Sequence, residues 1–254
     1  MIRIKEEAPY IVSLALDRPE VYNALSFEVL ADFSKILDDL AKKDIRALIV
    51  TGSGKSFSSG ADLKEIALFS PEQARDFSRA GHEVFDKLEG FPCPVVAAVN
   101  GYALGGGCEL ACACDLIYAS DKAKFGQPEA KVGMITGWGG TFRLAGRVGR
   151  PRAKELVFTG EIITAEKALE IGLLNGVFPS EEFWQGILNI AGRIAAVAPI
   201  AVRLEKALIN RSWPEDCRQG IEEADALRRC VETEDQKEGV RAFLEKRQAV
   251  FQNR

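Results

Sequence analysis

The sequence predicts an α/β domain with largely parallel strands, followed by a helical C-terminal region. Through the first two thirds of the chain, short β-branched runs alternate with amphipathic stretches, which is the pattern of parallel strands connected by helices. After about Pro199 the strand signal ends and only helical periodicity continues. The 254 residues, of which 47% are hydrophobic, suffice for a substantial core. We therefore expect an α/β core over 1–198 and a helical region over 199–254.

Four strands and two helices are expected in the α/β core. The strands are Ile11–Leu16, Ala47–Thr51, Val95–Val99 and Leu116–Ala119, and the helices run about Ser26–Lys43 and Pro71–Leu88. Ser70-Pro-Glu-Gln73 marks a helix start, because it combines a capping Ser, Pro at the first helical position and Gln three residues after the cap. The helical region should contain Ile200–Asn210, Asp216–Val231 and Gln236–Phe251, the last opened by the capping box Thr233-x-x-Gln236.

Charge and hydropathy argue against nucleic-acid and membrane partners. The net charge of −4 offers no general attraction to nucleic acid. The longest apolar runs are far shorter than the ~20 residues that span a bilayer, and a charged segment followed by an apolar one does not open the chain. We expect a cytoplasmic protein.

Cysteine and histidine usage argues against a metal centre. The six cysteines at 93, 108, 112, 114, 217 and 230 have no CxxC spacing, and most lie in apolar surroundings, as structural thiols do. The chain has a single histidine, His82, which excludes a two-histidine metal site. We expect no metal.

Two glycine-rich segments lack the spacing of nucleotide-binding loops. In Thr51-Gly-Ser-Gly-Lys-Ser56, the position that a phosphate-binding loop requires to be glycine is Ile49, inside the strand. Glycines 101, 105, 106 and 107 do not form the GxGxxG spacing of a dinucleotide fold. A nicotinamide cofactor is therefore disfavoured.

Gly105-Gly-Gly107 lies between an apolar strand and the helix expected to follow it. The first N–H groups of that helix have no partner within it, and the missing side chains allow a ligand oxygen to approach them. A second small-residue turn, around Ala61, also follows a strand and could supply a partner donor to Gly106. The two turns could share one oxyanion; the alternative is that the glycines only serve packing.

Two glutamates follow these glycines. Glu109 falls in the first helical turn, where the helix dipole favours the ionised form that suits a general base. Glu129 follows Phe125-Gly-Gln-Pro128, which would present its carboxyl from a loop fixed by Pro128. Each glutamate taken alone could also be a solvated surface acid.

Taken together, in order and spacing, several segments resemble the enoyl-CoA hydratase (crotonase) family. The resemblance covers essentially the whole chain and is carried by Leu16-Asp-Arg-Pro-Glu-Val-Tyr-Asn-Ala-Leu25, Ser59-Gly-Ala-Asp-Leu-Lys64, Asn100-Gly-Tyr-Ala-Leu-Gly-Gly-Gly-Cys-Glu-Leu110, Cys114-Asp-Leu-Ile-Tyr-Ala119, Phe125-Gly-Gln-Pro-Glu129, Gly139-Gly-Thr-Phe-Arg-Leu144, Thr159-Gly-Glu-Ile-Ile-Thr-Ala-Glu166, Gly172-Leu-Leu-Asn175 and Glu238-Gly-Val-Arg-Ala-Phe-Leu-Glu-Lys-Arg247. It implies a superhelix of ββα turns whose helical C-terminal part makes homotrimers, commonly paired into hexamers.

The resemblance also implies a coenzyme A thioester as substrate and no separate cofactor. The N–H groups of Ala61 and Gly106 would form an oxyanion hole for the thioester carbonyl. The nucleotide end of the ligand would contact Lys64 and the backbone of Ala61, Asp62 and Leu63, and further contacts to coenzyme A, often made across a subunit boundary, would come from Phe243 and Lys246.

Both glutamates match family positions, which implies hydration of a 2-enoyl thioester. Glu109 would take a proton from water as its oxygen attacks Cβ, and Glu129 would supply a proton to Cα. Trp138 departs from the family pattern, since Ile135-Thr-Gly-Trp-Gly-Gly140 replaces Ile-Pro-Gly, a small residue and Gly-Gly, and its size would narrow or reshape the acyl pocket. Ser58 and Ser59 replace common alanines and are expected to leave the backbone donors unchanged.

Two alternatives remain open at this point. The same enolate chemistry serves double-bond isomerisation and decarboxylation, and an isomerase would rely on Glu129 alone. A non-catalytic or RNA-binding relative of the fold is the alternative from another class, and the acidic composition argues against it.

Overall fold

The computed structural model describes residues 1–211 and 233–254. The predicted helix Asp216–Val231 lies outside these residues. Ten strands are described, namely β1 (Ile2–Ala8), β2 (Ile11–Leu16), β3 (Ala47–Gly52), β4 (Ser56–Ser58), β5 (Val95–Val99), β6 (Tyr102–Leu104), β7 (Leu116–Ser120), β8 (Lys124–Gly126), β9 (Ile162–Thr164) and β10 (Gly176–Phe178).

The helices of the described residues lie mainly between and after the strand pairs. They are η1 (Pro19–Val21), α1 (Phe27–Leu40), α2 (Leu63–Ile66), α3 (Pro71–Glu89), α4 (Gly106–Cys112), η2 (Pro128–Val132), η3 (Gly140–Leu144), α5 (Ala145–Val148), α6 (Arg150–Thr159), α7 (Ala165–Glu170), α8 (Phe183–Ala195), α9 (Pro199–Arg211) and α11 (Glu234–Glu245).

The strands form two sheets, and from β3 to β8 consecutive strands alternate between them. The larger sheet has the order β1-β2-β3-β5-β7-β10, and the smaller has the order β4-β6-β8-β9. β1 pairs antiparallel with β2, and β9 antiparallel with β8, whereas the other pairs are parallel. Three times a longer strand of the first sheet is followed by a short strand of the second, as in β5 and β6. This repeat is the ββα winding that the family resemblance implies.

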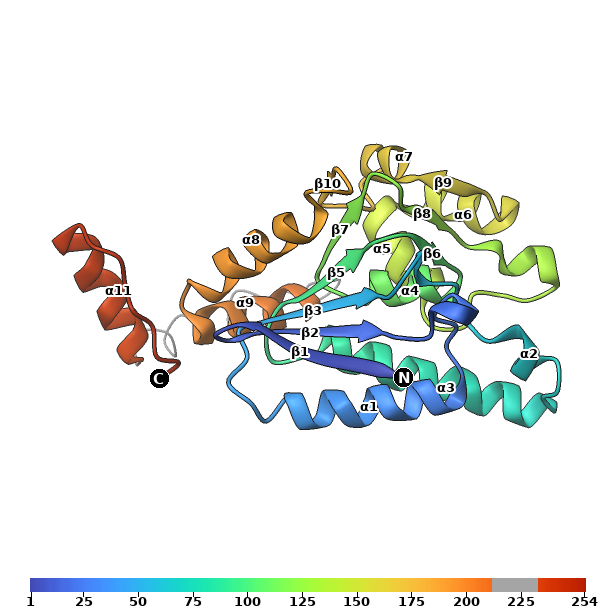
Figure 1. Ribbon diagram of the computed structural model, residues 1–254, viewed down its shortest axis with the longest axis horizontal. Coiled ribbons are helices and arrows are strands. Elements are labelled where there is room, and N and C mark those ends of the chain that lie inside the picture. Colours follow the sequence, from blue (N-terminus) through green and yellow to red (C-terminus); the bar gives the residue numbers. More distant parts are fainter. Residues whose placement is uncertain (212–232) are drawn as a thin grey trace.

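Helices cover both faces of the larger sheet (Figure 1). α1 and α3 lie together against one face, and the buried core between them and the sheet includes Phe33, Phe85 and Leu48. On the other face, α8 packs Phe183 and Ile187 against the sheet. Strands buried on both faces read as continuous apolar runs, as Val95–Val99 does, which explains why the sequence predicts them.

The predicted strands and core helices are confirmed with shifts of at most three residues at their ends, and the capping box at Ser70 and Gln73 is present. Six strands were not predicted. β1 is exposed along much of its length, and the others have only three residues each, too few for a periodic pattern.

The last helix was predicted to end too late. α11 stops at Glu245, and Lys246 takes a left-handed φ of 56° that reverses the chain. Glu238 holds the reversed segment, because its carboxylate accepts the Arg247 guanidinium and the Val250 N–H. In Figure 1, α11 lies at the opposite end of the molecule from α2.

Within the described part of the chain, no single helix is both long and apolar enough to cross a membrane. α8 and residues 199–210 of α9 together have the length and composition of a broken membrane span, but they meet at a bend of 102°.

Candidate active site

Two turns from different parts of the chain meet at the start of α4. Leu25 pairs with Ala61 in a parallel bridge, so that the Leu25 N–H donates to the Gly60 carbonyl and the Asp62 N–H to the Leu25 carbonyl. Gly60 has a φ of 90°, and a Cβ there would lie 2.8 Å from the Gly106 nitrogen. Residue 60 must therefore be glycine for the two turns to approach each other.

The contact of these turns leaves two backbone donors free. In the described chain, neither the Ala61 N–H nor the Gly106 N–H donates a hydrogen bond. Gly106 is the first residue of α4, whose initial N–H groups have no partner within the helix. Both residues line the same cavity. Two unpaired donors side by side are suited to hold one oxygen atom that gains negative charge.

The hydroxyl of Ser58 fixes the first of these turns. Its Oγ, fully buried, accepts the Gly60 N–H at 3.1 Å and donates to the Asn23 carbonyl at 2.9 Å. Asn23 is itself anchored, because its side-chain amide donates to the carbonyls of Ser53 and Ser56. Ser58 was expected to leave the backbone donors unchanged; in the structure its side chain also positions the turn that carries the Ala61 donor.

Backbone N–H groups from the loop before η3 and from the first residue of η3 bind the Glu109 carboxylate. Its Oε1 accepts the Trp138 N–H at 2.8 Å and the Gly140 N–H at 2.7 Å, and the residue is 1% exposed. Burial raises the pKa of the Glu109 carboxyl, although these N–H groups and Arg143 favour the charged form. Burial thus opposes the ionised form of Glu109 that the helix dipole was expected to favour, while the N–H groups of Trp138 and Gly140 support it.

Glu129 faces the same cavity from η2. Burial, and to a lesser extent the charge of Glu109, raises the pKa of Glu129 to about 7. Gln127 is fully buried beside Glu129. When the Gln127 amide is oriented with its nitrogen toward Glu129, this nitrogen donates to the two carboxylate oxygens at 3.0 and 3.2 Å. A Cβ at Gly105 would lie 2.9 Å from Glu129 Oε1, so the carboxylate rests against the glycine turn.

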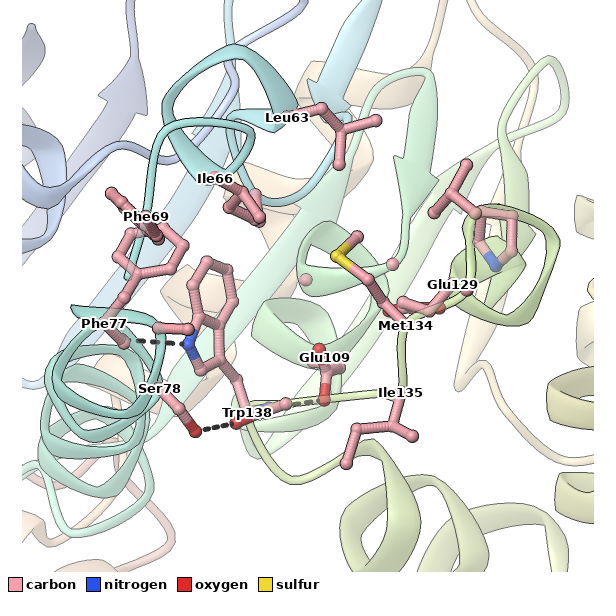
Figure 2. Close-up of a pocket in the computed structure, with 18 of the residues that line it drawn as sticks. Leu63, Ile66, Phe69, Phe77, Ser78, Glu109, Glu129, Met134, Ile135 and Trp138 are labelled. Atoms are coloured by element: carbon pink, nitrogen blue, oxygen red, sulfur yellow. Dashed lines mark hydrogen bonds between the residues drawn. The ribbon is translucent and has the colours of Figure 1, made fainter. Parts of the chain in front are cut away.

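The two carboxylates and the two free N–H groups border one cavity of about 590 Å³. Figure 2 shows Glu109 at its floor, Glu129 and Met134 on one side, and Trp138 with Phe77 on the other. Its remaining wall is mostly apolar and includes Leu63, Ile66, Phe69, Val132 and Ile135. An apolar cavity with a few converging polar groups and raised carboxyl pKa values is typical of an active site.

Most of the predicted site residues meet at this cavity. Ala61, Leu63, Gly106, Glu109, Glu129 and Trp138 line it. Asp62 and Lys64 do not: Asp62 caps α2 by accepting the Lys64 N–H, and Lys64 is exposed beside the rim.

The C-terminal candidates lie elsewhere in this chain. Lys246 is exposed in the turn directly after α11, and α11 lies far from α2 in Figure 1. Phe243 belongs to α11, and its side chain lies outside the residues that the structure describes.

Sequence reasoning missed the residues that shape the walls and orient the acids. Phe77 gave no signal beyond helical periodicity, and Phe69 lies outside the predicted helices. Gln127 was noted only as part of a segment leading to Glu129. His82 stacks on Phe142 and does not line the cavity.

The four described cysteines are free and buried, as predicted for structural thiols. Within residues 1–211 and 233–254, no group of three or more His, Cys, Asp or Glu side chains is arranged to hold a metal ion.

Comparison with known proteins identifies relatives along the whole chain. Residues 6–254 match the family model described as enoyl-CoA hydratase/isomerase. Crotonyl-CoA hydratase of Syntrophomonas wolfei is 44% identical, over 98% of this chain and 96% of that protein. Short-chain-enoyl-CoA hydratase of Clostridium acetobutylicum is 41% identical, over 99% and 98%. The crystal structure of enoyl-CoA hydratase from Bacillus anthracis superposes with a TM-score of 0.96 at 38% identity, covering 100% of this chain and 99% of that one.

Proposed function

This chain belongs to the enoyl-CoA hydratase/isomerase family and is an enoyl-CoA hydratase, and we propose that it uses Glu109 and Glu129 to hydrate short 2-enoyl-CoA thioesters. The observation that carries the assignment of these residues is their position on one cavity with the free N–H groups of Ala61 and Gly106. The names of the two similar proteins, crotonyl-CoA hydratase and short-chain-enoyl-CoA hydratase, support a short acyl chain.

The proposed reaction begins with the thioester carbonyl oxygen accepting the two free N–H groups. Glu109 removes a proton from water while the water oxygen bonds to Cβ, and the electrons of the double bond move to the carbonyl oxygen to give an enolate. Each oxyanion donor of this kind is typically worth ~10²–10³ in rate. Glu129 then gives its proton to Cα, which yields the 3-hydroxyacyl thioester. As the product leaves, the proton on Glu109 returns to Glu129 and restores both groups.

The direct test is the absorbance of the conjugated enoyl thioester. Purified protein with crotonyl-CoA should remove this absorbance and form 3-hydroxybutyryl-CoA, identified by chromatography against a standard. If crotonyl-CoA and its longer 2-enoyl homologues all stay unchanged, the proposal is wrong.

The rate should also depend on pH in a specific direction. Glu129 must be protonated to supply its proton, so its pKa of about 7 predicts that kcat/KM falls as the pH rises above about 7. Glu109 must be ionised, and burial raises its pKa, so kcat/KM should also fall on the acid side. A profile of initial rates that stays flat on the alkaline side would rule out Glu129 as the proton donor.

We propose that coenzyme A is held in part by a second copy of the chain in a trimer or a pair of trimers. Lys246 directly follows α11, and α11 lies at the opposite end of the molecule from α2, which borders the cavity (Figure 1). A contact to the ligand of a neighbouring chain would therefore account for the family match at Lys246. Light scattering should give a mass of three or six chains, and Lys246→Ala should raise KM for crotonyl-CoA with little change in kcat. A monomer with full activity would contradict both expectations.

A further inference from the structure

Trp138 lines one apolar side of the cavity, directly against Gly106, one of the two oxyanion donors. The residue is 3% exposed, and its ring contacts Phe77 and Phe85 edge-on, with centroid distances of 5.1 and 5.6 Å. In Figure 2 the indole stands between Phe77 and Glu109. Chain carbons beyond Cβ of a bound thioester would therefore run toward this ring.

The indole is seated on two glycines from different helices. A Cβ at Gly81, inside α3, would overlap the indole nitrogen, and a Cβ at Gly106 would overlap the six-membered ring. Glycine within a helix is less stabilising than alanine, so Gly81 lowers the stability of α3. A glycine at this position is explained if a close neighbour leaves no room for a side chain. Trp138 is that neighbour, because the ring occupies the space that any side chain at position 81 would need.

One hydrogen bond holds the indole directly, and others hold the loop that carries it. Its nitrogen donates to the Phe77 carbonyl at 3.3 Å, and the Trp138 carbonyl accepts the Arg143 guanidinium at 3.0 Å. Arg143 is buried and pairs with Asp86 and Glu89 of α3. The preceding residue, Gly137, accepts the Ser78 hydroxyl through its carbonyl at 2.8 Å. The loop that carries Trp138 is thus fastened to α3.

We propose that Trp138, seated on Gly81 and Gly106, is the residue that limits the length of the acyl chain in this enzyme. This inference rests on the proposed function. The ring fills the space between α3 and α4 that would otherwise extend the cavity toward Gly81 and Phe85, both of which are buried and do not line it. The acyl group is excluded from this space because the indole occupies it. A change of a single methylene in an apolar pocket alters kcat/KM by about 10–200-fold, so the effect is measurable.

The first experiment measures kcat/KM for crotonyl-CoA, 2-hexenoyl-CoA, 2-octenoyl-CoA and 2-dodecenoyl-CoA. In Trp138→Ala, the ratio of the 2-octenoyl to the crotonyl value should rise by at least about 10²-fold, with Trp138→Phe in between. Trp184→Ala is the matched control, because Trp184 lies on α8 and packs against the other face of the larger sheet. An unchanged ratio in Trp138→Ala, or an equal loss on all four substrates, would overturn the proposal.

A second experiment tests the seat itself. Gly81→Ala should lower both the crotonyl-CoA activity and the melting temperature, because the new Cβ meets the indole. In the Trp138→Ala background, Gly81→Ala should lower neither the activity nor the melting temperature, because the indole ring is absent. Equal effects of Gly81→Ala in the two backgrounds would show that the glycine does not serve Trp138.

Binding of saturated acyl-CoA separates this proposal from the assignment of the reaction. Calorimetry with butyryl-CoA and octanoyl-CoA needs no turnover. It therefore measures the chain-length preference of binding even if the wild-type protein fails to hydrate crotonyl-CoA. Wild type should prefer butyryl-CoA, and folded Trp138→Phe should shift toward octanoyl-CoA. If Trp138→Phe binds both with the wild-type preference, the proposal fails, whatever the outcome of the hydration assay.

Discussion

Replacing Glu109 or Glu129 by Gln should each reduce kcat for crotonyl-CoA by ~10²–10⁴, the usual contribution of a positioned acid or base. Glu109→Gln removes the base but keeps a side-chain oxygen that can accept the Trp138 and Gly140 N–H groups. Glu129→Gln removes the proton that is to reach Cα. The fold should persist in both, and steady-state rates measured beside thermal unfolding will show whether it does.

Glu155→Gln is the matched control, because it makes the same chemical change on an exposed face of α6. It should leave kcat and the melting temperature unchanged. An isomerase that relies on Glu129 alone would keep most of its activity in Glu109→Gln when assayed with a 3-enoyl-CoA. Near wild-type hydration by Glu109→Gln, with the variant confirmed by mass, would contradict its role as the base.

The sequence predicts the parts of the fold that are buried on both sides and long enough to show a period. Val95–Val99 is an example, because every residue of this strand is buried. β4, β6 and β8 have three residues each, and such segments are stabilised by pairing with one another and not by a pattern of their own. The family resemblance supplied the ββα winding that periodicity could not reveal.

The site was predictable where backbone chemistry alone determines it. Glycines at a helix start predict free N–H donors, and Gly106 provides one. The raised pKa of Glu109 was not predictable, because it depends on burial in the folded chain. The N–H groups that reach its carboxylate from residues 138 and 140 were not predictable either. The contact of Trp138 with Gly81 could not be predicted either, because only folding brings α3 against the loop that carries Trp138.

Ala61→Pro should lower kcat for crotonyl-CoA by ~10²–10³, the typical effect of removing one oxyanion donor. Proline has no N–H, and in the described chain the Ala61 N–H supports no other hydrogen bond, so the change removes a donor to substrate and no donor to the fold. The Leu25 bridge uses the Gly60 carbonyl and the Asp62 N–H, both of which remain.

The readout must separate a lost donor from a distorted turn. Loss of the Ala61 donor alone would weaken stabilisation of the enolate. Saturated butyryl-CoA forms no enolate, so it should bind nearly as in wild type. A distorted turn would also weaken that binding and lower the melting temperature. Ala61→Ser, which keeps the N–H and changes only the side chain, is the companion variant and should keep most of the wild-type kcat. If Ala61→Pro is folded, binds butyryl-CoA and hydrates crotonyl-CoA at the wild-type rate, then Ala61 is not an oxyanion donor, and Gly106 would have to hold the enolate oxygen without it.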